Sequence, residues 1–284
     1  MKMRNRHWQK FLKFGKGLNT LTIKELRAVC QPAYKQKIDP LMEWYLLRPF
    51  SIYFTWFFVR LGVGPNWVTL MGMLLGCAGS GLLMLGQVGW GVAGAVLIWL
   101  GFLFDCVDGE VARYSGKGSL RGTYLDYFVG GVNDMAIMLG LSFYVAQTMG
   151  WPLVLVVTAG VAMAYLEKII GLYAQCVIYR NIRASWDSVE VDEAQSYDDK
   201  VWKEMGLWSR LLRVPFETFF RASLILVAFI VGASVGEHQV VAWAWVLILV
   251  LGYTLVAKSF YSEFFQDRVG TSMADFIGAL KGRV

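Results

Sequence analysis

Long apolar stretches, separated by short polar turns, dominate the chain from residue 68 onward. A helix of about 20 apolar residues is long enough to cross the hydrocarbon core of a bilayer, and most of these stretches carry no charged residue. The pattern therefore predicts an all-α, polytopic membrane protein with six transmembrane helices. The six predicted spans are Val68–Gly86, Val88–Phe104, Tyr127–Ala146, Trp151–Tyr179, Ala222–Gly236 and Val240–Ala257.

The segment before the first span is aromatic and basic. The apolar core of Arg48–Gly62 is too short to cross a bilayer, which favours an N-terminal amphipathic helix at the membrane interface over an additional span. Gly64 and Pro65 then break the chain. We expect three parts: an N-terminal cytosolic segment at 1–64, a six-helix transmembrane domain at 65–265 and a cytosolic tail at 266–284.

Lys and Arg are distributed unevenly between the two sides of the predicted spans. Residues 1–64 hold twelve Lys and Arg against three acids, and the turns after the second and fourth spans are also basic, whereas the opposite turns contain no Lys or Arg. The positive-inside rule therefore places both termini in the cytosol, in the inner membrane if the protein is bacterial. The polar link 181–213 would lie on the same side, as a solvated loop or as a lid over a site.

The composition agrees with a membrane protein. Apolar residues make up 56% of the chain, and the mean hydropathy is +0.47, which is far above that of a soluble domain. The net charge of +6 lies beside the spans, where anionic lipid head groups are a simpler partner than nucleic acid. The four cysteines are scattered and indicate no disulfide framework.

Three aspartates stand out near the cytosolic end of the second and third spans. Asp105 and Asp108 share one face of a helix, about 13 Å before its end, and Asp126 lies about 10 Å into the next helix. A short turn joins the two helices, so we expect antiparallel neighbours whose carboxylates meet at one depth. Carboxylates near a membrane are costly unless they serve a function. A shared divalent cation, Mg²⁺ or Mn²⁺, explains them best.

The three aspartates belong to a longer motif with fixed spacing. The run from Asp105 to Arg113, followed by Gly122 and Asp126, reads D-x2-D-G-x2-A-R-x8-G-x3-D. This spacing resembles the signature of the CDP-alcohol phosphotransferase family, integral membrane enzymes of phospholipid biosynthesis. The family pattern ends with x3-D, where this chain has Gly130, and the next acid is Asp134.

The resemblance implies a chemistry and a set of roles. A substituted phosphate would pass from a CDP-linked donor to an alcohol, with release of CMP, and both lipid and alcohol would be substrates. Asp105, Asp108 and Asp126 would bind the metal. Homodimers are common among such proteins, so a homodimer is expected by analogy. The implied nucleotide-binding residues are Pro65, Asn66, Thr69, Asp105, Gly109, Ala112, Arg113 and Gly122.

The proton acceptor is open at this point, because Gly130 replaces the implied general base. Candidates are Asp126, Asp134 and Glu167; Glu110 is unsuitable because helix spacing points it away from the other motif acids. Asp134 lies about 12 Å along the axis from Asp126, so it would need a helix break at Gly130, and its alternative role is pairing with Lys168. An acceptor that needs little deprotonation, or that uses the metal or its own phosphate, is a further alternative.

Two cations in or near the spans, Lys168 and Arg221, are candidate ligands for a phosphate on the acceptor. Arg221 is close enough to a span end to extend into the interface instead. The rival function is a weakly active or non-catalytic family member that binds CDP-linked lipid, which Gly130 favours. A transporter is a third reading, disfavoured because the acids gather at one face and not at the bilayer midplane.

Overall fold

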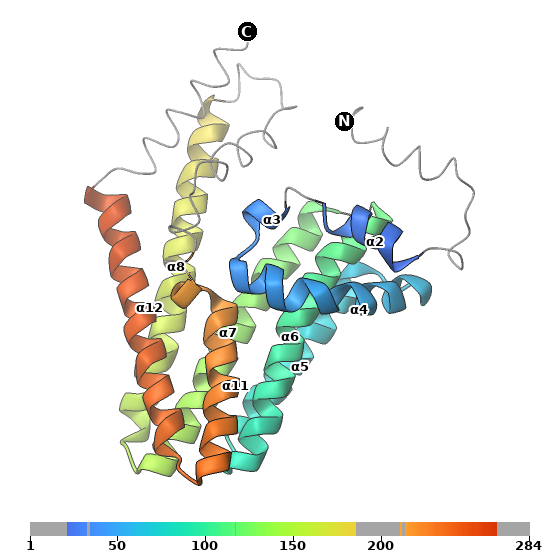
Figure 1. Ribbon diagram of the computed structural model, residues 1–284. Helices are drawn as coiled ribbons and strands as arrows, with labels where there is room; N and C mark the ends of the chain where they lie inside the picture. Colours follow the sequence, from blue (N-terminus) through green and yellow to red (C-terminus); the bar gives the residue numbers. More distant parts are fainter. Residues whose placement is uncertain (1–21, 33–34, 117, 186–210, 212–213, 266–284) are drawn as a thin grey trace, which may run out of the picture.

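The computed structural model describes residues 22–32, 35–116, 118–185, 211 and 214–265, and this part of the chain is helical with no strand (Figure 1). The predicted tail 266–284 and nearly all of the link 181–213 lie outside the described residues. The elements are α2 (Ile23–Cys30), α3 (Lys35–Ile38), the π-helical turn η2 (Glu43–Leu47), α4 (Arg48–Arg60), α5 (Pro65–Leu83), α6 (Val88–Ser115), α7 (Leu120–Met149), α8 (Leu153–Ser185), η4 (Val214–Phe216), α11 (Thr218–Val235) and α12 (Gln239–Phe265).

The long helices form one bundle, and α4 lies across it near the end that also carries α2 and α3 (Figure 1). Five helices in the described region, α5, α6, α7, α11 and α12, are long and apolar enough to cross a membrane. The helix α8 has 33 residues, but its side chains are described only as far as Ile169. The all-α polytopic prediction is confirmed, whereas the count of six spans stays a prediction. The 13-residue α4 is the helix expected at the interface.

The turn between the two motif helices forms where the sequence indicated. Helix α6 ends at Ser115, and Gly116 follows with a φ of 64°, a left-handed conformation that glycine adopts at no steric cost. Helix α7 begins at Leu120, where the Ser119 hydroxyl accepts a hydrogen bond from Gly122 N. Helix α7 then continues without a break through Gly130, so the helix break that would have moved Asp134 is absent.

The expectation that α6 and α7 pack as neighbours is wrong. Helix α5 packs extensively against both, and α6 and α7 have no comparable contact with each other. The α5–α6 interface is close because glycines face each other: Gly72 lies opposite Gly101, and Gly79 lies opposite Gly94. A short connection does not oblige two helices to touch along their length. Here the space between α6 and α7 is instead part of a cavity, which is the site described next.

Candidate active site

The three motif aspartates converge at the cytosolic end assigned by the sequence. Asp105 and Asp108 come from α6 and Asp126 from α7, and one carboxylate oxygen of each lies within 4.8 Å of the others. Asp108 is buried, while Asp105 and Asp126 are exposed. Three carboxylates from two helices form an all-oxygen donor set, which suits a hard cation such as Mg²⁺ or Mn²⁺. The residues therefore fit the metal that the spacing predicted.

Asp108 is held from a third helix. The Thr69 hydroxyl, one turn into α5, donates a short hydrogen bond to Asp108 Oδ2, and the carbonyl of Pro65 lies 3.1 Å from the same hydroxyl. The sequence assigned Thr69 to the nucleotide. The structure places it behind the Asp108 carboxylate, where its hydrogen bond orients that candidate metal ligand.

The remaining nucleotide candidates lie around the same helix ends. A Cβ atom built on Gly122 would lie 3.4 Å from Asn66 Oδ1, and one built on Gly109 would lie 3.3 Å from the Arg113 guanidinium. The absent side chains therefore leave room beside both polar groups. Ala112 is half-buried, between Asp108 and the end of α6.

In the Arg113 guanidinium one nitrogen is hydrogen-bonded, and another is buried without a hydrogen-bond partner among the described residues. Its Nε donates to the carbonyl of Cys30 at 2.7 Å. Its Nη2 is buried without a hydrogen-bond partner among the described residues. A buried guanidinium nitrogen without a partner is costly, so this group is suited to receive an anionic oxygen.

An open cavity adjoins the aspartates. Asp105 and Asp126 line one part of it, and Gly130, Asp134 and Lys168 line another. One open space therefore connects the aspartate cluster with Asp134 and Lys168.

The Lys168 ammonium occupies the neighbourhood of the missing acid. Lys168 Nζ lies 2.8 Å from Asp134 Oδ2 and would lie 3.6 Å from a Cβ atom at Gly130. The pairing of Asp134 with Lys168, an alternative that the sequence left open, is therefore present.

Glu167 and Arg221 form a separate buried pair. Arg221 Nη1 donates to both oxygens of Glu167 at 2.9 Å, and the two side chains line a smaller pocket beside the main cavity. Arg221 Nε is buried and has no hydrogen-bond partner in the described structure. Neither residue lines the cavity that contains Asp126.

The sequence did not reveal that the N-terminal segment builds part of the site. Pro40, Glu43 and Leu47 line the main cavity, as does Glu217 at the start of α11. Glu217 accepts hydrogen bonds from the backbone N–H groups of residues 41 and 42, and so ties this segment to α11. Burial raises the pKa of Glu43, while Arg48 opposes the shift. No spacing rule connects a residue near position 43 with a motif at position 105.

A family model of the CDP-alcohol phosphatidyltransferases matches residues 63–250. The chain belongs to this family. The resemblance read from the motif is therefore confirmed, and the match spans α5 to α11 and the first part of α12.

Curated relatives match a shorter stretch. The phosphatidylinositol phosphate synthase of Mycobacterium bovis is 37% identical over 88 residues, which is 31% of this chain and 40% of the relative. The archaetidylinositol phosphate synthase of Pyrococcus horikoshii is 29% identical over 82 residues, which is 29% of this chain and 42% of the relative. The chain thus spans about 40% of the length of the curated relatives that it matches.

A solved structure shares the fold. The crystal structure of Mycobacterium tuberculosis phosphatidylinositol phosphate synthase with CDP-DAG bound aligns with a TM-score of 0.52 at 21% identity, over 75% of this chain and 92% of that protein.

Proposed function

We propose that this family member is a divalent-metal-dependent transferase that moves a substituted phosphate from a CDP-linked donor to an alcohol and releases CMP. The observation that carries the proposal is the cluster of three carboxylates, Asp105, Asp108 and Asp126, two of which, Asp105 and Asp126, line an open cavity. Family membership supports the reaction class.

At the donor end, Asp105, Asp108 and Asp126 would hold one or two Mg²⁺ or Mn²⁺ ions. When bound, such ions neutralise the pyrophosphate charge and stabilise the CMP leaving group. Thr69 orients Asp108, and the free Arg113 Nη2 is available to a donor phosphate oxygen. Pro65, Asn66, Gly109, Ala112 and Gly122 would surround the nucleotide.

At the acceptor end, the hydroxyl oxygen forms a bond to the β-phosphorus, the bond from that phosphorus to the CMP oxygen breaks, and the hydroxyl proton passes to a base. We assign the base to Asp134. Asp126 would be a ligand of the metal. Glu167 lies outside the main cavity, where both of its carboxylate oxygens accept hydrogen bonds from Arg221. Because α7 is unbroken, Asp134 stays about 12 Å along the axis from Asp126 and cannot share the metal. Among the three candidates it alone both lines the cavity and lies outside the aspartate cluster, so we propose that it takes the proton of an acceptor hydroxyl bound between the two positions.

Lys168 is better placed than Arg221 to receive an anionic group of the acceptor. Lys168 lines the main cavity, whereas Arg221 is engaged by Glu167. The donor we propose is CDP-diacylglycerol, because the relative of known structure binds CDP-DAG. We also propose that both termini and the site face the cytosol and that the protein forms a homodimer.

The second candidate function is a non-catalytic member that binds CDP-linked lipid. The observation that favours it is Gly130, which leaves no carboxylate where the family motif has one. The two candidates make opposite predictions for turnover.

The deciding experiment is CMP release by the purified protein in lipid, with CDP-diacylglycerol or CDP-alcohols, a panel of polyols and polyol phosphates, and Mg²⁺, Mn²⁺ or chelator. The transferase predicts metal-dependent CMP release that Asp105→Asn abolishes. The binding protein predicts tight CDP-lipid binding without CMP release, and turnover gained on Gly130→Asp. Absence of both binding and release would overturn both proposals.

A further inference from the structure

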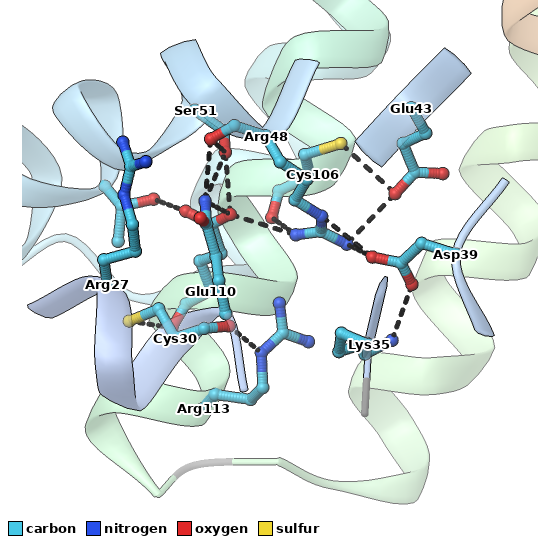
Figure 2. Close-up of polar contacts among 12 residues, drawn as sticks. Arg27, Cys30, Lys35, Asp39, Glu43, Arg48, Ser51, Cys106, Glu110 and Arg113 are labelled. Atoms are coloured by element: carbon cyan, nitrogen blue, oxygen red, sulfur yellow. Dashed lines mark hydrogen bonds and ion pairs between the residues drawn. The ribbon is translucent and has the colours of Figure 1, made fainter. Parts of the chain in front are cut away.

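Glu110 lies inside the metal-binding motif but faces away from the metal. Its side chain is fully buried, and its position two residues after Asp108 places it on the other side of α6; Figure 2 shows its surroundings. A buried carboxylate is costly unless its oxygens are fully hydrogen-bonded.

All its partners come from the N-terminal segment. Glu110 Oε1 accepts from Arg48 Nη1 at 3.0 Å, Ser51 Oγ at 2.7 Å and Gln31 Nε2 at 2.8 Å. Glu110 Oε2 accepts from Thr55 Oγ1 at 2.6 Å. Four donors satisfy this one carboxylate, three of them from α4 and one from the end of α2.

Arg48 extends the network beyond Glu110. Its guanidinium also contacts Asp39 Oδ2 at 2.8 Å and Glu43 Oε1 at 3.0 Å, as Figure 2 shows. Its Nη1 lies 3.4 Å from the carbonyl of Cys106, which directly follows Asp105 in the chain. The network therefore contacts α6 at Cys106 and at Glu110, one turn apart, on the side opposite the proposed metal site.

We propose that Glu110 is a positioning residue, which fixes the rotation of α6 and hence the places of Asp105 and Asp108 relative to Asp126. The reason is geometric. Asp126 is on α7, and α6 and α7 lack extensive contact with each other, so the relative placement of their carboxylates depends largely on the elements that pack around each helix. Thr69 provides one such constraint, and the Arg48–Glu110 network provides another. The inference rests on the proposed metal site.

The test measures metal affinity and not turnover. Mn²⁺ dissociation constants are determined for the full chain in detergent, with the melting temperature measured in parallel. Glu110→Gln keeps the shape but removes the charge that Arg48 pairs with, and Thr55→Val removes one hydrogen bond only. Thr22→Ala is the matched control, because it removes the N-cap of α2 in the same segment and none of the hydrogen bonds to Glu110.

We expect Glu110→Gln to weaken Mn²⁺ binding by about tenfold, as loss of outer-shell support does at other metal sites, with a smaller loss for Thr55→Val. Thr22→Ala should lower the melting temperature and leave the Mn²⁺ affinity unchanged. If Glu110→Gln bound Mn²⁺ with wild-type affinity, the positioning role of Glu110 would be overturned and the proposed metal site would stand. If Glu110→Gln does not fold, wild-type Mn²⁺ affinity in Thr55→Val would have the same consequence. Failure of the wild type to bind Mn²⁺ would overturn the proposed metal site together with it.

Discussion

Lys168 and Asp134 form an ion pair of 2.8 Å between α8 and α7, inside the cavity that the metal-binding acids adjoin. The pair stands where the family motif has its last acid, since a Cβ atom at Gly130 would lie 3.6 Å from the same ammonium. Asp134 lies about one turn along α7 from Gly130, and Lys168 neighbours both positions.

This relationship predicts that Asp134→Asn lowers kcat for CMP release by about 100-fold, the lower range for a general base, with CMP and Mn²⁺ binding retained. Steady-state kinetics and equilibrium binding measure the two effects. Adding Gly130→Asp to Asp134→Asn should restore activity, because the new carboxylate reaches the same part of the cavity.

Full activity in Asp134→Asn would rule out Asp134 as the base. If Asp134→Asn is inactive and adding Gly130→Asp does not restore activity, the role of Asp134 would be only to form the ion pair with Lys168. The pH profile of the rescued variant separates a restored base from a restored ion pair, since only a base adds a titrating group to kcat.

Thr69 tests whether the support of Asp108 matters. Thr69→Val keeps the shape of the side chain and removes the hydroxyl that bonds Asp108. We expect it to weaken Mn²⁺ binding by about tenfold, with Thr69→Ser near the wild type. If Thr69→Val instead raised KM for the CDP-linked donor and left the Mn²⁺ affinity unchanged, the nucleotide role predicted from the sequence would hold.

The parts of the site that a local pattern encodes were predictable. Asp105 and Asp108 share a face because of helix geometry, and the position of Asp126 follows from the length of the connecting turn. Short-range rules also placed a break at Gly64 and Pro65, where α5 begins.

What the sequence could not supply are contacts between distant segments. Arg48 and Glu110 are 62 residues apart, and no periodicity links them. The same holds for Glu217, whose carboxylate caps backbone N–H groups about 175 residues earlier. The placement of α5 beside both motif helices, which overturned the expected pairing of α6 with α7, depends on glycine contacts such as Gly79 with Gly94. Such contacts are decided by packing and not by any local spacing.

Cys30 predicts a specific response to alkaline pH. Burial raises the pKa of the Cys30 thiol from 9.0 to about 12, and its Sγ donates to the carbonyl of Glu110. Between pH 9 and pH 12 the unfolded thiol loses its proton while the folded one keeps it. The free energy of unfolding should therefore fall as pH rises through this window, by at most about 1.4 kcal/mol per pH unit, and ionisation of Cys30 should not change it with pH below pH 9.

The measurement is the stability difference between the wild type and Cys30→Ala in detergent at pH 8 and at pH 10.5. We expect the wild type to be more stable at pH 8, because alanine leaves a void at a fully buried position, and the difference to narrow at pH 10.5. A difference that stays constant with pH would show that the Cys30 thiol ionises equally in both states.

Gly79 and Gly81 provide a paired test of helix packing within α5. A Cβ atom on Gly79 would lie 2.5 Å from the carbonyl oxygen of Gly94 on α6, a contact with backbone that cannot swing aside, whereas a Cβ atom on Gly81 meets nothing within 4 Å. Gly79→Ala should therefore destabilise the protein by about 1–3 kcal/mol through overpacking. Gly81→Ala should be neutral or stabilising by up to about 1 kcal/mol, since alanine favours a helix more than glycine does.

Melting temperatures of the two variants in one detergent give the comparison. Because α6 carries Asp105 and Asp108, Gly79→Ala should also weaken Mn²⁺ binding, whereas Gly81→Ala should not. Equal stabilities of the two variants would mean that α5 and α6 separate easily. In that case the close α5–α6 contact could not be what holds the metal-binding helix against Thr69, and the N-terminal network at Glu110 would have to supply that restraint alone.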